Sequence, residues 1–331
     1  MKERTIQKED KFLSRFALKS KDTVGRLKQE QPCPMRTDFE RDRDRIIHCK
    51  AFRRLKNKTQ VFFSPEGDHY RTRLTHTLNV SQVARAIARS LDLNEDLTEA
   101  IALGHDLGHT PFGHSGERIL NKLSPKGFEH NLQSGRVVDF LENDGKGLNL
   151  TREVVDGIIN HKMSCNPKTL EGKAVSLADR IAYINHDIDD AIDGGFIVKN
   201  DLPKSSVEIL GETSRQRINT MLRSIYEQSH GKNTVEMQPD VALATKELRD
   251  FMFERVYNAK TFRDEERRAD RMLTALYEYY MKSPENLPEF YLERLKTDDI
   301  DTVLCDYISG MSDMYAVKTF NEIFVPKNWK L

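Results

Sequence analysis

Histidine residues are concentrated in one part of this sequence. The chain has ten histidines, and three of them, His105, His109 and His114, fall within the stretch GHDLGHTPFGHSGE. Such crowding is unusual, because each buried imidazole needs a partner for both ring nitrogens. A neutral imidazole next to a carboxylate, as in His105 and Asp106, suits a borderline or hard divalent metal ion. The sequence therefore predicts a metal site at this position.

Two further metal ligands are expected from separate helices. Adjacent helical residues point about 100° apart, but the apolar pattern ends here with Gly108, and a terminating helix can turn both side chains toward one ion. His76 lies in one amphipathic segment and Asp179 in another, VSLADRIAYINHD. Metal sites in helical bundles form where side chains of several helices converge. The alternative is that a lone histidine or a His-Asp pair is an ordinary surface or core feature.

Apolar spacing predicts helices along nearly the whole chain, and therefore an all-α fold class. The expected helical segments are 74–91, 97–107, 116–124, 129–143, 151–161, 173–193, 205–229, 240–258, 264–282, 286–296 and 299–320. Alternation typical of a strand is almost absent, and its best candidate, 59–63, is equally compatible with an extended loop. No Gly- or Pro-bearing break is long enough for a flexible linker.

The expected organisation is a single helical domain over residues 1–331. Within it, we expect residues 40–195 to form the catalytic core. Residues 196–331 are expected to form a C-terminal helical part that completes the pocket and an oligomer interface.

Composition excludes several classes of protein. Lys and Arg together number 52, as do Asp and Glu, whereas a nucleic-acid binder usually has excess positive charge. The four cysteines are far apart and form no CxxC pair, which argues against a disulfide framework or a thiolate zinc site. The chain contains no membrane-length apolar run and no GxxxxGK[ST] phosphate loop. We expect a cytoplasmic protein without a membrane or nucleic-acid partner.

Longer stretches resemble a known family. RTRLTHTLNVSQVARAIA, ALGHDLGHTPFGHSGE, FEHN and LADRIAYINHDIDDAI are similar to bacterial deoxynucleoside triphosphate triphosphohydrolases, the dGTPase-like branch of the HD-domain superfamily. RDRDRIIHCKAFRRLKNKTQVF and DYISGMSDMYAV resemble the terminal blocks of that family, so the resemblance spans about 36–320. It implies an HD-domain helical bundle extended by a C-terminal helical region. It also implies hydrolysis of a dNTP to deoxynucleoside and inorganic triphosphate, by attack of water at the alpha phosphorus.

The same resemblance implies a complete metal site beside that phosphate. Its four ligands match His76, His105, Asp106 and Asp179. Two imidazoles and two carboxylates accept Mn²⁺, Mg²⁺ or another first-row transition metal. Such an ion can polarise a phosphate and lower the pKa of water.

His114 and Glu117 are the predicted source of the proton that the leaving alkoxide needs. They are three residues apart, so they share a face if a helix begins near His114. A carboxylate beside an imidazole orients it and favours its protonated form, which makes a usable general acid. The resemblance assigns the same pair to catalysis. The alternative for Glu117 is that it only stabilises a helix N-terminus.

Three residues are expected at the phosphates. Arg73 lies one turn before His76, and a guanidinium fork suits phosphate oxygens. His109 and His130 are expected to contact the phosphates or to orient the metal ligands. The alternative for both histidines is a buried, hydrogen-bonded side chain.

Three other residues are expected at the sugar. Tyr183 and Asp187 follow Asp179 at four-residue steps, on one face of a helix. The resemblance places Tyr183 where a 2′ hydroxyl would otherwise fit, and Asp187 and Gln60 at the 3′ hydroxyl. The alternatives are a tyrosine packed in the core and an exposed aspartate.

Two partners and two rival functions complete the expectations. We expect a homo-oligomer, with the alternating charges of ERDRDR at a solvated or interface face, and an allosteric nucleotide is a further candidate partner. The first rival is an HD phosphatase or phosphodiesterase that acts on another nucleotide and releases a different product. The second is a non-catalytic HD protein that senses nucleotides.

Overall fold

The computed structural model describes residues 1–60, 71–257 and 260–326. Over these ranges helices are the dominant regular structure, and the only β pairing is two isolated bridges, Arg26 with Thr151 and Thr59 with Thr72. The predicted all-α class is confirmed. Most of the strand candidate at 59–63 lies outside the described residues. In the ranges that the structure describes, no helix is both long and apolar enough to cross a membrane.

In the residues that the structure describes, seventeen α-helices follow one another, and the longest described connection, residues 13–37, joins α1 to α2. The first ten are α1 (Lys2–Phe12), α2 (Asp38–His48), α3 (Lys50–Arg54), α4 (Arg73–Ser90), α5 (Glu95–Gly104), α6 (Gly113–Leu123), α7 (His130–Arg136), α8 (Glu142–Gly145), α9 (Arg152–Ile159) and α10 (Leu170–Asp193). The others are α11 (Lys204–Leu210), α12 (Ser214–Ser229), α13 (Pro239–Met252), α14 (Lys260–Lys282), α15 (Glu289–Arg294), α16 (Ile300–Ser309) and α17 (Asp313–Phe324).

The structure differs from the sequence prediction in three helices before residue 74, α1 to α3, which were not predicted, and in several helix breaks. The segment predicted at 205–229 divides into α11 and α12 at Gly211, whose φ of +104° is accessible to glycine but strained for other residues. The segment predicted at 299–320 divides into α16 and α17 beyond Gly310. Between α7 and α8 the chain forms a π-helical turn, Val137–Leu141. Apolar periodicity continues across such breaks, so it does not reveal them.

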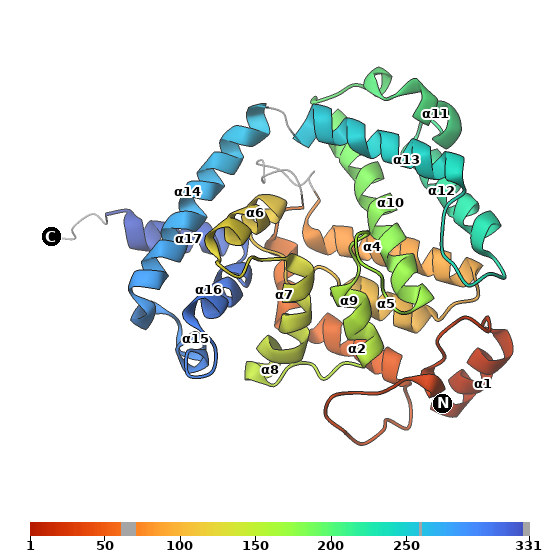
Figure 1. Cartoon of the computed structure of the whole chain (residues 1–331), viewed down its shortest axis with the longest axis horizontal. Coiled ribbons are helices and arrows are strands. Elements are labelled where there is room, and N and C mark those ends of the chain that lie inside the picture. Colours follow the sequence, from red (N-terminus) through yellow and green to blue (C-terminus); the bar gives the residue numbers. More distant parts are fainter. Residues whose placement is uncertain (61–70, 258–259, 327–331) are drawn as a thin grey trace.

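The main core forms where α4, α5 and α10 pack together, with α2 and α9 against α5 (Figure 1). Alanines on the facing sides, among them Ala84, Ala88, Ala178 and Ala182, are fully buried and let the helix axes approach closely. This packing brings the first turn of α4, the end of α5 and the middle of α10 to one place. These are the positions of the predicted metal ligands.

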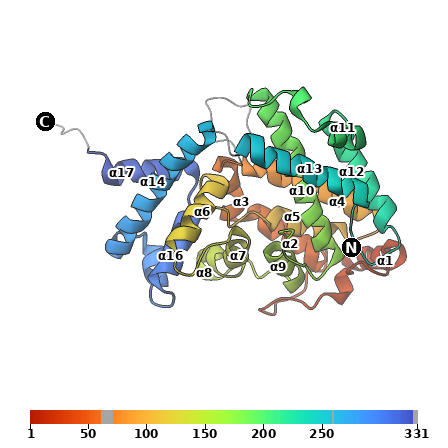
Figure 2. The same cartoon turned by 45° about the horizontal axis from the view of Figure 1, so that its top comes forward.

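The helices after α10 belong to two different apolar clusters. Helices α12 and α13 pack on α10, α12 also packs on α4, and α11 packs on α12 and α13, so the three extend the main core. Helices α14 to α17 form a second cluster with α6, in which Leu120 meets Leu273 and Ile308. Figure 2 shows α6 beside α14 and α16, away from α11 to α13. The predicted boundary near residue 195 stays a prediction.

The arginines of the N-terminal block pair with nearby acids. Arg41 and Arg45 both contact Glu30, at 2.9 and 2.6 Å, and Arg43 lies 3.0 Å from Asp96. These ion pairs attach α2 to its neighbours within the chain. The predicted use of this block in an oligomer interface stays a prediction.

Candidate metal centre and active site

His76 and Asp179 face each other across the contact between α4 and α10. Thr72 caps α4 by accepting a hydrogen bond from the amide of Thr75 at 3.4 Å, which places His76 in the first turn on the buried face. His76 Nε2 lies 3.1 Å from Asp179 Oδ1. The two predicted ligands, 103 residues apart in sequence, are therefore in direct contact.

His105 and Asp106 lie in the turn that follows α5, as predicted. Gly108 in this turn touches the backbone of α7, and a Cβ there would lie 2.2 Å from the amide nitrogen of Ser134. The Ser134 hydroxyl accepts from the Gly108 amide at 2.9 Å and donates to the His105 carbonyl at 2.8 Å. These contacts hold the turn against α7.

The orientation of His105 leaves a ring nitrogen available for a metal. Its Nδ1 lies 2.6 Å from the carbonyl oxygen of Ala102, which can only accept, so Nδ1 carries the proton. Its Nε2 therefore has a lone pair; this buried atom has no hydrogen-bond partner. It lies 3.6 Å from Asp106 Oδ2 and 3.9 Å from Asp179 Oδ1. An unpartnered imidazole nitrogen facing two carboxylates fits a bound cation.

The four predicted ligands are therefore brought together. Ligand atoms of His76, His105 and Asp106 all lie within 4.8 Å of one another, and Asp179 contacts both histidines. Burial acts to raise the pKa of Asp106, but its electrostatic interactions with His105 and Arg73 outweigh burial and hold that pKa well below its usual range. The cluster thus presents ionised carboxylates and imidazole nitrogens, a donor set that can hold a divalent metal.

Arg73, expected at the phosphates, is committed to the metal cluster in this structure. It is 1% exposed, and its guanidinium donates to Asp106 Oδ2 at 2.7 Å and to the Gln60 carbonyl oxygen at 3.2 Å. The side-chain oxygen of Gln60 is buried and has no hydrogen-bond partner. Arg73 and Gln60 are thus neighbours at the edge of the cluster.

His114 and Glu117 form the predicted pair at the start of α6. Phe112 and Gly113 both have left-handed backbones, with φ of +60° and +58°, and they turn the chain into the helix. His114 Nδ1 then lies 3.1 Å from Glu117 Oε2. The expected helix start near His114 is confirmed, and the His114 side chain remains 62% exposed.

Glu117 also holds His130, at the start of α7. His130 donates to Glu117 Oε1 from its ring Nδ1 at 2.8 Å and from its backbone amide at 2.9 Å. Burial acts to raise the pKa of Glu117, but the hydrogen bonds from His114 and His130 outweigh it and hold the pKa far below its usual range. Glu117 is therefore an ionised acceptor that fixes two imidazoles at once.

His109 lies in the same group and is fully buried. Its ring stacks on that of His130, with centroids 4.5 Å apart and planes at 22°. Neither ring nitrogen of His109 has a hydrogen-bond partner. Burial lowers the pKa of His109 well below its usual range, so the ring is neutral. A neutral imidazole with a free N–H is available to bind a ligand.

The sugar residues predicted on α10 lie as the helical spacing requires. Asp187 is buried and accepts a hydrogen bond from the hydroxyl of Tyr257. Burial raises the pKa of Asp187 to about 7. Tyr183, one turn closer to Asp179, is half-buried. The alternative given from the sequence, that Asp187 is an exposed aspartate, is wrong.

Comparison with known proteins places the chain in a family. Residues 73–184 match the model of the HD domain, and residues 235–322 match that of the phosphohydrolase-associated domain. A deoxyguanosinetriphosphate triphosphohydrolase-like protein of Caldanaerobacter subterraneus subsp. tengcongensis is 56% identical over 99% of this chain and 97% of its own length. The protein of the same description from Clostridium tetani is 48% identical over 93% and 92% of the two chains. The chain belongs to the deoxyguanosinetriphosphate triphosphohydrolase-like family.

The resemblance stated from the sequence motifs is thereby confirmed. All four predicted metal ligands lie inside the HD domain, and α13 to α17 make up most of the phosphohydrolase-associated domain. A solved structure of a hypothetical protein from Aquifex aeolicus is more distant, with 20% identity and a TM-score of 0.46 over 86% of this chain and 68% of that one.

Sequence reasoning missed three residues that contact the predicted site residues. His161, after α9, lies 3.2 Å from His130 between the two Nε2 atoms, and Lys162 lies 3.3 Å from Glu117 Oε1. The one signal for His161 in the sequence was its position as the polar last residue of the apolar segment predicted as a helix over 151–161. Tyr257 had no signal, because only folding brings it to α10.

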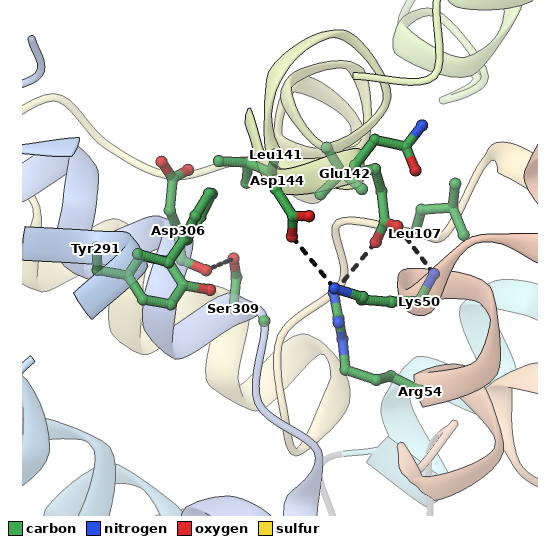
Figure 3. Close-up of a pocket in the computed structure, with 13 residues that line it drawn as sticks. Lys50, Arg54, Leu107, Leu141, Glu142, Asp144, Tyr291, Asp306 and Ser309 are labelled. Atoms are coloured by element: carbon green, nitrogen blue, oxygen red, sulfur yellow. Dashed lines mark hydrogen bonds and ion pairs between the residues drawn. The ribbon is translucent and has the colours of Figure 1, made fainter. Parts of the chain in front are cut away.

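A cavity of about 210 Å³ lies behind the HD turn and not at the histidines. Leu107 forms part of its wall, with residues of α3, α8 and α16. In Figure 3, the Lys50 side chain points toward Asp144 and Arg54 toward Glu142, whose carboxylate also accepts from the Lys50 amide at 2.8 Å. The cavity thus marks the junction between the HD core and the C-terminal helices.

Proposed function

We propose that this chain hydrolyses a dNTP to a deoxynucleoside and inorganic triphosphate. The observation that carries the proposal is the position of the His114–Glu117–His130 group beside a four-residue metal cluster. A phosphohydrolase needs positive charge at the phosphate and a proton for the leaving oxygen, and these two groups offer both. The names of the relatives make dGTP a natural first substrate to test.

His76, His105, Asp106 and Asp179 would hold the metal. When bound, a divalent ion supplies positive charge at the alpha phosphate and lowers the pKa of water. The chain prepares for it by fixing the ligands: Ala102 sets the tautomer of His105, and Arg73 orients Asp106. Partners of this kind commonly tune metal affinity as strongly as the ligands do.

His114 is the proposed general acid. In the reaction, the oxygen of water bonds to the alpha phosphorus and the bond from that phosphorus to the sugar O5′ breaks. The departing O5′ takes a proton. Glu117 engages His114 Nδ1, so the opposite nitrogen, Nε2, is free to point at the substrate. The exposure of this side chain supports a role at an open site.

His109 is the strongest candidate for a phosphate donor. Both of its nitrogens are buried and unpartnered, and a phosphate oxygen would satisfy its N–H. The Arg73 guanidinium already donates to Asp106, so it can bind a phosphate only if it serves both partners at once. His130 is held by Glu117, which leaves its Nε2 as the atom facing the site.

The sugar contacts proposed for α10 and Gln60 rest on unused hydrogen-bonding capacity. Asp187 accepts from Tyr257 and retains lone pairs for a 3′ hydroxyl. The buried amide oxygen of Gln60 is unpartnered and can accept from a ligand hydroxyl. Tyr183 would lie against the ring of the deoxyribose.

Product analysis tests the proposal directly. Purified protein is incubated with each of the four dNTPs, alone and in mixtures, with Mn²⁺, Mg²⁺ or Co²⁺, and products are separated by ion exchange. We expect equal amounts of deoxynucleoside and triphosphate, and a large loss in a His114→Asn variant but not in the exposed His48→Asn control. Release of inorganic phosphate, or nucleotide binding without turnover, would refute it.

Three further expectations stay predictions. Activation of one dNTP by another in the mixtures would indicate the allosteric nucleotide. Light scattering of the pure protein would show whether it forms a homo-oligomer. Fractionation of the source cells would show whether the protein is cytoplasmic.

A further inference from the structure

The two terminal sequence motifs meet at the loop that carries the proposed acid. This loop, residues 109–112, joins the HD turn to α6, in whose first turn His114 lies. Lys58 comes from RDRDRIIHCKAFRRLKNKTQVF and Asp313 from DYISGMSDMYAV, and each contacts the backbone of the loop. Neither residue has a role in the proposed function.

Lys58 holds the beginning of the loop. Its side chain is 1% exposed, and complete burial of a lysine is rare and costly. Its Nζ donates to the carbonyl oxygen of His109 and, at 2.7 Å, to that of Ser309. Ser309 is the last residue of α16, where carbonyl groups have no partner within the helix. One amino group thus joins the loop to the C-terminal helices.

Asp313, the first residue of α17, holds the end of the loop. It is 9% exposed, and its Oδ1 accepts from the Phe112 amide at 3.0 Å. Its Oδ2 accepts from the Thr59 amide at 3.0 Å and from the Thr59 hydroxyl. Phe112 has a left-handed backbone, with φ of +60°, which costs free energy and persists only where the surroundings hold it. The carboxylate therefore stabilises the turn that directs His114.

Lys58 and Thr59 also contact the start of α4, the helix that carries His76. The Lys58 carbonyl accepts from the Arg73 amide at 3.0 Å, and Thr59 pairs with Thr72 in an isolated β-bridge. The same two residues are thus bonded to the helix of a metal ligand and, directly or through Asp313, to the loop. These contacts fix the proposed acid relative to the metal cluster.

We propose that Lys58 and Asp313 are positioning residues, which hold the 109–112 loop so that His114 meets the leaving oxygen. The inference rests on the proposed function and deepens it, because it gives the C-terminal helices a part in catalysis. The alternative is that both residues only attach α16 and α17 to the HD core. Their loss would then lower stability, but the folded protein would keep its activity.

The kinetics of Asp313→Asn test the proposal. Asparagine keeps the shape of the side chain but has one acceptor oxygen, so it cannot serve every donor that the aspartate serves. At a temperature at which circular dichroism shows each variant folded, we expect kcat for triphosphate release to fall about ten- to 100-fold, the effect of a small displacement of a reacting group.

Asp301→Asn is the matched control. Asp301 lies in the first turn of α16 and accepts from the Ser124 hydroxyl at 2.7 Å and from the Tyr277 hydroxyl, away from the loop. We expect its kcat to stay within about twofold of the natural protein, as for a substitution outside the site. An Asp313→Asn variant that is folded and as active as this control would overturn the proposal.

A double variant shows whether Asp313 acts through His114. His114→Asn already lacks the proposed acid, so adding Asp313→Asn should lower kcat by less than about threefold. A second fall as large as that in the single variant would overturn the proposal. Lys58→Met, which has a similar length and no donor, should follow the same pattern. Thr59→Val, which removes one donor to Asp313, gives a milder test if Asp313→Asn does not fold.

Spectra of histidine rings give a readout that needs no activity. In nuclear magnetic resonance of protein with isotope-labelled histidines, Asp313→Asn should move the ring signals of His109 and His114 and leave that of the exposed His230 in place. Asp301→Asn should move none of them. Unmoved signals of His109 and His114 in Asp313→Asn would overturn the positioning role. A natural protein that releases no triphosphate would refute the proposed function, and these spectra would still test the positioning.

Discussion

Replacing Glu117 by glutamine is the sharpest single test of the proposed proton donor. Glu117 accepts from the rings of His114 and His130, from the amide of His130 and from Lys162. Glutamine has a single acceptor oxygen, and its amide nitrogen would present hydrogens to one of the imidazole N–H groups. The variant therefore keeps the shape of Glu117 but loses at least one charge-assisted hydrogen bond.

The expected loss follows from the strength of that bond. A hydrogen bond to a charged group contributes about 1.5–3 kcal/mol. At about 1.36 kcal/mol for each tenfold change in rate, this corresponds to about a ten- to 150-fold fall in kcat. The fall should stay far below the upper end of the roughly 10²–10⁴-fold range of general acid catalysis as a whole, because His114 itself remains.

Steady-state triphosphate release gives kcat and KM for the variant. The control is Glu129→Gln, because Glu129 shares Lys162 with Glu117 at 3.0 Å and is largely exposed. We expect the control to stay within about twofold of the natural protein, in line with the small effect of exposed ion pairs. A Glu117→Gln variant with kcat within threefold of the natural protein would show that Glu117 only stabilises the start of α6.

Three other predictions concern metal, packing and pH. Chelation should abolish triphosphate release and lower the melting temperature, since an ion held at 100 times its Kd stabilises by about 2.7 kcal/mol; readdition of Mn²⁺ should restore both. Gly108→Ala should destabilise the fold by about 3 kcal/mol in urea unfolding, because its Cβ would lie 2.2 Å from the amide nitrogen of Ser134; an unchanged midpoint would contradict this contact. Burial raises the pKa of Glu171 from 4.5 to about 7, so the folded chain holds this proton more tightly than the unfolded chain, and stability falls as pH rises between these values. The Glu171→Gln variant should therefore gain about 3 kcal/mol on the natural protein between pH 4.5 and 7.5, and a constant difference across that range would count against the buried charge.

The fold class could be predicted because apolar periodicity is a local property. The amphipathic segments around His76 and Asp179 are helices, with His76 on the buried face of α4 and Asp179 half-buried on α10. The division of 205–229 at Gly211 could not be predicted, because the apolar pattern resumes after the break. The two core clusters could not be predicted either, since the contact of α6 with α14 joins segments about 150 residues apart in sequence.

Parts of the site could be predicted to different extents. His114 and Glu117 share one helical turn, so spacing alone was enough to pair them. The position of Arg73 one turn before His76 was equally predictable, but the hydrogen-bond partner of Arg73, Asp106, was not. Asp106 comes from the turn after α5, and only the tertiary structure shows its contact with Arg73. The role of Arg73 at the phosphates stays a prediction.

The sequence by itself determined the residue types that can do chemistry and the helices that carry them. Only the tertiary structure decided which ring nitrogens are left free, because tautomers depend on partners such as the Ala102 and Ile158 carbonyls. It alone brought His161 to His130 and Tyr257 to Asp187. Helix periodicity specifies the face on which a side chain lies, whereas the packing of distant helices specifies what that face meets.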